Sequence, residues 1–581
     1  MQTEWNLSYL YSGFDDPAFA SDLENLKSLI RQTETDLKHA TSDADYLTLF
    51  VSRHETVSCL MEKLYSYCEL TLSADASNTE AEMNLDQVML IANDLSLLSS
   101  SVTRRLGSME HLEEVIASTP ALQPCAFALR EMASQARHSI PEAIEPWILK
   151  MQLSGGNAFA MLRNKLDATH LVDYRGEQLP LSSVRGLAYS PDADVRRDAY
   201  DAEIASYAKM EIPMAASLNA IKMEARTLSE LKGYSSVLDM TLCESRMDAE
   251  TLEAMWTAVR EFLPDFRRYL LAKAKLLGHP NGLPFYDLFA PVGKGRTYTL
   301  EEAHSLLLRE MGKFTPRMAD FMDHAFQNAW IDVYPRPGKS GGAFCAEVHS
   351  ADRSLVLTNF QGSFSDVSTL AHELGHAWHN RCLAGLPYLM IDIPMPLAET
   401  ASIFNETMLS YQVLASCSPE EELHLLENGL MEATQTVVDI YSRFLFESEV
   451  ISTRADHAMS PEELKDAMLR AQDLSYGEGL DPTFRHPYMW ACKSHYYASE
   501  LNFYNFPYAF GLLFGKGVFA RYLKEGSAFV DTYCQLLRSC GSAPVAEVAA
   551  SVGIDVHSVD FWRESLNMIR RDIDRFCALA Q

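Results

Sequence analysis

Apolar residues recur along most of this chain at spacings of three and four, the pattern of amphipathic helices. In the stretch 16–98, for example, Phe19, Leu23, Leu26 and Ile30 form one such stripe. Side chains at these spacings share one face of a helix, which can then pack against other helices. The pattern predicts a mostly α fold, with a short β excursion at residues 170–181.

The helical pattern is interrupted further along the chain by one short strand. Residues 354–360, Ser-Leu-Val-Leu-Thr-Asn-Phe, have the apolar character of a strand. A helix is expected directly after it, because Ser363 or Ser365 can cap its first turn. Asp366 places a negative charge in that turn, where the helix dipole favours it.

The length of the chain bounds its organisation. With 581 residues it exceeds the size that one hydrophobic core usually serves, so two lobes or more are expected. A helix start with Ser190 as cap and Pro191 at the first helical position favours a boundary there. We therefore divide the chain into an N-terminal helical lobe, residues 1–190, and a larger domain, residues 191–581.

Charge and cysteine content exclude several classes of function. The 49 basic and 79 acidic residues give a net charge of −30, which repels phosphate backbones and anionic lipid. We therefore expect neither nucleic acid nor a membrane as a partner, and no apolar stretch approaches the ~20 residues of a membrane span. The N-terminus lacks the features of an export signal. Eleven cysteines without a C-x-x-C pair are typical of reduced thiols, which predicts a cytoplasmic protein.

The helix expected after residue 363 contains His372-Glu373-Leu-Gly-His376, an H-E-x-x-H motif. Residues four apart lie one turn apart on a helix, so both imidazoles face one side and can share a metal ion. Neutral imidazole is a preferred zinc ligand, and the glutamate between them can take a proton from metal-bound water. Because the motif fixes only three residues, it can also arise by accident, so a zinc site needs a third ligand.

Glu399 is the candidate for that third ligand. It lies in the first turn of a helix that Pro394 and Pro396 are expected to start. A carboxylate that faces the two histidines completes a His₂Glu site with one position left for water.

Two more side chains accompany this set. Glu406 lies two turns beyond Glu399 on the same face, where it can hydrogen-bond and orient a ligand histidine or belong to a solvated face. His379 is offset by three from His376, and we expect it to support the ligands from behind or to pack. A third histidine ligand six residues after His376 is absent, because position 382 is Cys.

Two segments bear on the substrate. Residues 490–511 are dense in tyrosines and carry one histidine, a composition that usually means core or interface. Water attack on a peptide carbonyl, however, develops negative charge on oxygen, which Tyr hydroxyl and His N–H groups beside a metal can stabilise. The Gly-rich segment 335–342, which includes Gly341 and Gly342, is either a loop that covers the substrate or a plain exposed turn.

Together these motifs resemble the M3 family of zinc oligopeptidases, and within it the oligoendopeptidase F branch. The resemblance is carried by His372-Glu-Leu-Gly-His-Ala-Trp-His, by Glu399 in Ala-Glu-Thr-Ala-Ser, and by Phe503-Tyr-Asn-Phe-Pro-Tyr-Ala-Phe-Gly. Glu399 follows His372 by 27 residues, close to the family's spacing. The likeness extends to Gly338-Lys-Ser-Gly-Gly-Ala-Phe and covers most of the chain from about residue 110 onward.

The resemblance implies a two-lobed, zincin-like helical fold of the neurolysin type. It would have a deep channel between the lobes and a small β-sheet near the zinc, and residues 191–581 would be the catalytic M3 peptidase domain. It also implies one Zn²⁺ per chain, bound by His372, His376 and Glu399, with Glu373 as the general base.

The same resemblance implies how substrates are held. His495, Tyr504 and Tyr508 would contact the substrate or the oxyanion, and Tyr497 competes for such a role. Family members pair the strand before the zinc helix, here around Leu357, with the peptide backbone. Main-chain hydrogen bonds do not read side chains, so such pairing suits a broad range of short, unstructured peptides.

The sequence thus favours a zinc-dependent oligoendopeptidase, and two alternatives stay open. One is a helical zinc metallocarboxypeptidase, since related helical peptidases share H-E-x-x-H with a later glutamate. The other is a non-catalytic helical peptide-binding protein in which the motif is accidental.

Overall fold

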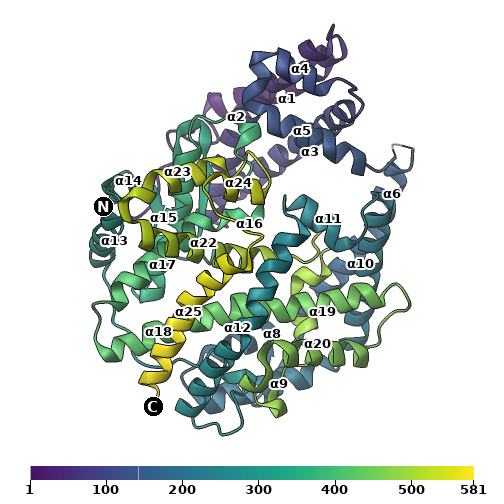
Figure 1. Cartoon of the computed structure of the whole chain (residues 1–581). Coiled ribbons are helices and arrows are strands. Elements are labelled where there is room, and N and C mark those ends of the chain that lie inside the picture. The colour runs from purple at the N-terminus through teal and green to yellow at the C-terminus, as the bar shows by residue number, and fades with distance from the viewer. Residues whose placement is uncertain (1, 142) are drawn as a thin grey trace.

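The computed structural model describes residues 2–141 and 143–581 of the chain (Figure 1). Helices make up most of these residues and two small β-sheets accompany them, so the predicted mostly α fold is confirmed. In the described part of the chain, no helix is both long enough and apolar enough to cross a bilayer.

Five helices form the N-terminal part of the molecule, drawn in purple to blue at the top of Figure 1. Phe19, Leu23, Leu26 and Ile30, the apolar stripe of the first helix, are all buried in the core that these helices share. The helices are α1 (Pro17–Lys38), α2 (Asp43–Ala74), α3 (Thr79–Gly107), α4 (Leu112–Ser118) and α5 (Ala126–Gln135).

The next part combines helices with the expected β excursion. The excursion is an antiparallel hairpin of β1 (Leu171–Tyr174) and β2 (Glu177–Pro180). Val172 of β1 lies in a second core with residues from both sides of position 190, and the division at that position stays a prediction. The helices are α6 (Glu145–Ser154), α7 (Gly156–Thr169), α8 (Leu181–Gly186), α9 (Ala193–Tyr207), α10 (Glu211–Leu231), α11 (Val237–Glu244) and α12 (Ala249–Leu276).

The start of α9 differs from the expectation. Asp192 caps the helix, because its carboxylate accepts hydrogen bonds from the N–H groups of Asp194 and Val195. Ser190 and Pro191 therefore lie before the helix, and the prediction that Ser190 caps it was wrong. A carboxylate is the stronger acceptor at a helix N-terminus, since the dipole adds to the hydrogen bonds.

The remaining helices enclose the largest core. They are α13 (Leu300–Phe314), α14 (Pro316–Gln327), α15 (Phe364–Leu383), α16 (Met395–Ala398), α17 (Thr400–Leu414), α18 (Pro419–Ala433), α19 (Ile440–Thr453), α20 (Pro461–Tyr476), α21 (Met489–Cys492), α22 (Phe506–Glu525), α23 (Phe529–Ser539), α24 (Val545–Ser551) and α25 (Val559–Leu579). A π-helical turn, Thr434–Asp439, joins α18 to α19. The last helix, α25, packs along α12 and against α22, so the yellow and teal helices lie together in Figure 1.

A three-stranded sheet precedes the helix that carries the H-E-x-x-H motif. Its strands are β3 (Ile331–Asp332), β4 (Phe344–Val348) and β5 (Arg353–Leu357), in the order β3-β5-β4. β5 runs parallel to β3 and antiparallel to β4, so β5 is the central strand and β4 lies at an edge. Both β4 and β5 pack against α15, which confirms the expected small sheet near this helix.

Candidate metal centre

Helix α15 presents two histidines one turn apart. Its start is fixed by a capping box: the Ser363 hydroxyl accepts from the Asp366 N–H (3.1 Å), and the Asp366 carboxylate accepts from the Ser363 N–H (2.8 Å). Ser363, one of the two expected caps, is therefore the actual one. Further along, the Nε2 atoms of His372 and His376 lie 3.1 Å apart.

Glu399 brings a carboxylate to the same point. It lies at the junction between α16 and α17, as the C-cap of one helix and the N-cap of the next. Its Oε2 lies 3.3 Å from His372 Nε2 and 3.4 Å from His376 Nε2, and it also accepts a hydrogen bond from Ser402 (2.7 Å). Two imidazoles and one carboxylate so close together are a donor set that fits zinc.

Charges in this cluster show how strongly it attracts a cation. Burial acts to lower the pKa of His372, but the hydrogen bond and negative charge of Glu406, with the charges of Glu399 and Glu373, raise it to about 9. Burial acts to raise the pKa of Glu399, but its contacts with His376 and His372 lower it to about 2. The ring of His372 thus attracts a proton strongly at the point where a divalent metal would replace it.

Glu406 lies behind the first histidine. Its Oε1 is 2.9 Å from His372 Nδ1, the ring nitrogen opposite the one that faces Glu399. An Nδ1–H donated to this carboxylate leaves the Nε2 lone pair free for a metal and makes it more basic. The geometry matches the orienting role considered for Glu406 in the sequence.

We expect Glu406→Gln to weaken zinc binding about 10- to 100-fold, because the neutral amide supports the imidazole less well. The measurement is a zinc titration against a competing chelator of known affinity. Glu420→Gln, a change at an exposed carboxylate on α18, is the matched control. An unchanged zinc affinity in Glu406→Gln would show that the hydrogen bond to His372 has no part in metal binding.

Two glycines let the helices around the site approach closely. A Cβ on Gly375 of α15 would lie 2.7 Å from the carbonyl oxygen of Ala401 and the Cα of Ser402, both backbone atoms of α17. A Cβ on Gly511 of α22 would lie 2.8 Å from the Cβ of Glu399. Glycine at these two positions allows α17 and α22 to hold the carboxylate against α15.

Glu373 lies between the two histidines in sequence and is 6% exposed. Burial raises the pKa of its carboxyl, while the charges of His372 and His376 act to lower it. Cys345 of the edge strand β4 lies close enough for the Glu373 charge to raise the pKa of its thiol, although burial is the larger cause. Burial thus makes this carboxylate a better proton acceptor than a free glutamate, as a general base requires.

The aromatic segment contributes a row of donors beside Glu399. The hydroxyls of Tyr504 and Tyr508 are 2.8 Å apart, and Tyr508 is near enough for the Glu399 charge to raise its pKa, after burial and the contact with Tyr504. The ring of His495 lies 6.0 Å from that of Tyr504. Burial, followed by the charge of Arg443, lowers the pKa of His495 to about 3, so its imidazole is neutral. Among the described residues its buried Nε2 has no hydrogen-bond partner.

His379 does not support the metal ligands as expected. It is 1% exposed, and its Nε2 lies 3.1 Å from the carbonyl oxygen of Leu537 in α23. Three positions along a helix turn a side chain by about 300°, which is enough here to direct the ring to the neighbouring helix. The prediction that His379 supports the ligands is therefore corrected: it fastens α15 to α23.

Leu357 cannot pair with a substrate backbone. It lies in the central strand β5, between Asp332 of β3 and Phe344 of β4, and is completely buried. Strand addition needs an unpaired edge, and in this sheet β4 supplies it. The prediction that Leu357 binds substrate was therefore wrong. The β-forming run Phe-Cys-Ala-Glu-Val at 344–348 was the available sequence signal for the edge strand β4.

Tyr497 is enclosed by other protein side chains. It is 2% exposed within the second core, and the guanidinium of Arg163 covers its ring at 5.3 Å. A side chain so enclosed offers no surface to a peptide, so its assignment to substrate binding was wrong.

Hydrogen bonds of Lys339 hold the Gly-rich segment 335–342 in place. The Lys339 ammonium is buried and donates to the carbonyl oxygens of Thr358 (2.5 Å) and Tyr334 (2.9 Å). Gly341 and Gly342 follow this anchor, and no described residue other than their chain neighbours has an atom within 4 Å of a Cβ built on either. The carbonyl oxygen of Gly342 accepts a hydrogen bond from the Asn359 side chain (2.9 Å), and the contact of the two glycines with substrate stays a prediction.

Comparison with known proteins places the chain in a family. A model of peptidase family M3 matches residues 186–568, which include the three candidate ligands and the donor row. The chain belongs to this family. The oligopeptidase PepF of Bacillus subtilis is 22% identical to this M3 peptidase over 583 residues, covering 98% of this chain and 86% of that protein.

Solved structures share the fold of this M3 peptidase. A crystal structure of a protein from Chlamydophila abortus superposes with a TM-score of 0.87 at 22% identity, covering 99% of this chain and 98% of that one. The oligoendopeptidase-F of Enterococcus faecium superposes with a TM-score of 0.70 at 18% identity, covering 97% and 98% of the two chains. The resemblance to the oligoendopeptidase F branch is thereby confirmed.

Proposed function

We propose that this M3 peptidase is a zinc-dependent oligoendopeptidase that hydrolyses short, unstructured peptides. The observation that carries the proposal is the convergence of His372, His376 and Glu399 with Glu373 beside them. The donor set fits zinc, and three protein ligands leave a coordination position open, as in catalytic zinc sites.

A zinc ion held by these ligands would supply Lewis-acid activation of a water molecule and of the peptide carbonyl. Glu373 would accept the proton of the attacking water and return it to the departing amine, because it is the buried carboxyl next to the ligands. Tyr508, with its hydroxyl held by Tyr504, would donate to the carbonyl oxygen as negative charge develops there. His495 would donate from its neutral ring in the same row.

The edge strand β4 would hold the peptide backbone. Its residues are only partly buried from Phe344 to Glu347, and Cys345 places the strand next to Glu373. Main-chain pairing along this edge aligns an extended peptide without selecting its side chains. This explains why unstructured peptides, and not folded proteins, are the proposed substrates.

We expect the zinc-loaded protein to cut an internally quenched nonapeptide whose C-terminus is amidated. An endopeptidase does not need a free carboxylate, so cleavage should occur inside the peptide and should stop when a chelator removes zinc. Product masses identify the cut bond. If only peptides with a free C-terminus lose residues one at a time, the protein is a metallocarboxypeptidase and the proposal is wrong.

A further inference from the structure

A cavity of about 430 Å³ lies apart from the candidate metal centre. Helices α8 and α9 form one side of it, and the loop around Phe285–Phe289 and the segment from His486 to Lys493 form the others. A space of this size accommodates one large side chain or the last residue of a peptide. The cavity is not lined by His372, His376 or Glu399.

One wall of this cavity is aromatic. The rings of Tyr189 and Phe289 lie 4.8 Å apart, and those of Phe285 and His486 lie 5.1 Å apart. Such a wall favours contact with methylene groups or an apolar side chain. The specific recognition must therefore come from the polar side chains of the cavity.

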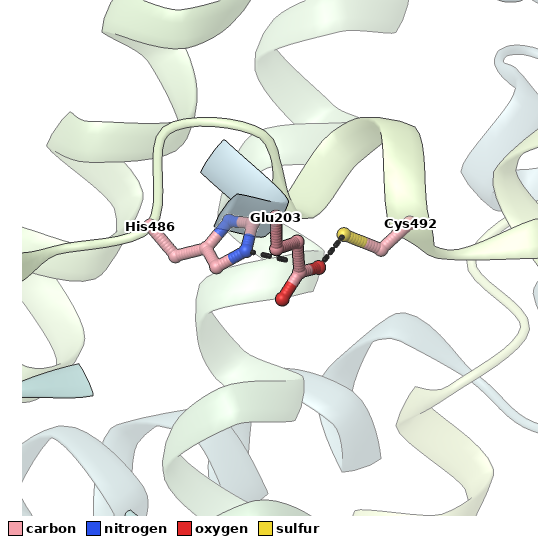
Figure 2. Close-up of side chains that lie close together, drawn as sticks. All are labelled: Glu203, His486 and Cys492. Atoms are coloured by element: carbon pink, nitrogen blue, oxygen red, sulfur yellow. Dashed lines mark hydrogen bonds and ion pairs between the residues drawn. The ribbon is translucent and has the colours of Figure 1, made fainter. Parts of the chain in front are cut away.

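Glu203 and His486 form the polar floor of the cavity, and their side chains and that of Cys492 point toward one another in Figure 2. These donor types can bind zinc. However, the Arg185 Nε lies 3.2 Å from the same Glu203 oxygen that accepts from the Tyr207 hydroxyl (2.9 Å). The negative charge of this carboxylate is thus already balanced by a guanidinium, which makes the cluster a neutral floor and a poor cation site.

The other charged groups around the cavity are also paired, with one exception. Arg196 donates to Asp287 (2.7 Å). Asp439 accepts from Arg443 Nε (2.8 Å) and from the Tyr476 hydroxyl (3.2 Å). Each of these carboxylates therefore already has its partner.

The exception is Lys493, a half-buried cation that lines the cavity. Within residues 2–141 and 143–581, no carboxylate oxygen lies within 4 Å of its ammonium. Burial lowers its pKa to about 8, although the charge of Asp439 acts to raise it. The side chain therefore remains mostly protonated at neutral pH, and an ammonium in such a place gains most from an anionic ligand.

The position of Lys493 connects this cavity to the catalytic residues. It precedes His495 by two residues, and its charge is among the causes that lower the pKa of that imidazole. His495, Tyr504 and Tyr508 form the row that leads back to Glu399. Lys493, which lines the cavity, is thus near enough to His495 for its charge to act on the imidazole in this row.

We propose that this cavity is a substrate subsite that binds a peptide carboxylate through Lys493. The carboxylate comes either from an acidic side chain or from the free C-terminus, and its methylene groups or neighbouring side chain contact the aromatic wall. The inference rests on the proposed peptidase function. It adds a preference for peptides with a carboxylate at one position, which the net charge of −30 would not suggest.

The test measures peptide binding to the zinc-loaded Glu373→Gln protein by fluorescence anisotropy, so that turnover does not interfere. The probes are neutral nonapeptides with an uncharged coumarin at the N-terminus. In the first series, a single Glu occupies each position of the peptide in turn. Each of these peptides has a matched peptide with Gln at the same position, and all of them have an amidated C-terminus. In the other, the side chains stay neutral and the C-terminus is a free acid or an amide.

We expect one Glu position, or the free C-terminus, to strengthen binding about tenfold or more, the effect of a hydrogen bond to a charged group. Lys493→Met should abolish this difference in affinity. The Kd of the variant for the Gln and amide peptides should stay within about twofold of the Kd measured without this substitution. The variant should fold, because removing a partnerless, half-buried ammonium relieves a desolvation cost. Its melting temperature checks this, and Lys294→Met at an exposed lysine is the control.

The outcomes separate the two proposals. The subsite would be overturned if the two peptides of every matched pair bound with equal affinity, or if the preference for the carboxylate peptide survived in Lys493→Met. The proposed peptidase function would still stand. Failure to bind any peptide would contradict the proposed function and the subsite with it. A preference confined to one series identifies the carboxylate as a side chain or as the C-terminus.

Discussion

Glu373→Gln should lower kcat about 10²- to 10⁴-fold and leave the zinc content at one ion per chain. The expected loss is that of a general base, because an amide can still hydrogen-bond to water but cannot take its proton. Glutamine has nearly the same shape, so the buried position of Glu373 should accept it without a cavity or a clash. Zinc content and peptide KM should therefore stay near the wild-type values.

The measurement combines metal analysis with kinetics on the internally quenched nonapeptide. Glu347→Gln, a change at a second partly buried carboxyl near the site, is a suitable control, since burial likewise raises the pKa of Glu347. Glu347 contacts His349 on the side of the sheet and takes no part in the proposed proton transfer. Wild-type turnover in Glu373→Gln would rule out this carboxyl as the base.

Glu399→Ala should abolish both stoichiometric zinc and detectable peptide hydrolysis at ordinary zinc concentrations. Two histidines alone hold zinc far less tightly than the three-ligand set of catalytic sites. Zinc should raise the melting temperature of the wild-type protein, because a ligand that binds the folded state stabilises it, and should leave that of the variant unchanged. This readout does not depend on activity.

The control for this variant is Ser402→Ala, which removes a hydrogen bond to Glu399 but keeps the carboxylate. It should retain zinc with a modest loss of affinity. If Glu399→Ala still binds one zinc ion per chain and cleaves peptide at the wild-type rate, residue 399 is not a ligand. The site would then need another third donor, and the proposed mechanism would lose its geometric basis.

The parts of the site that could be predicted are those set by local rules. His372 and His376 share a face because of helix geometry alone, and the capping box at Ser363 fixes where that helix starts. Glu399 could be found because prolines mark the chain just before it. Its exact setting, in a break between two helices and not in a first turn, depends on the close packing of α22 at Gly511.

The wrong predictions depend on contacts between distant parts of the chain. Leu357 reads as a good strand residue, but only the pairing of β5 with both β3 and β4 shows that it is enclosed. Tyr497 is one of several tyrosines in a short segment, and Arg163, more than three hundred residues earlier, covers it. His379 faces away because α23 supplies an acceptor. No periodicity in the sequence contains this information.

The packing of α25 on α12 and α22 has a consequence for how the molecule is made. During translation, the apolar surfaces of α12 and α22 leave the ribosome well before residues 559–579 arrive to cover them. A nascent chain that still lacks α25 therefore exposes this apolar surface, to which holding chaperones bind. Since α22 also packs against Glu399 through Gly511, the helix that α25 covers is the same one that positions a candidate ligand.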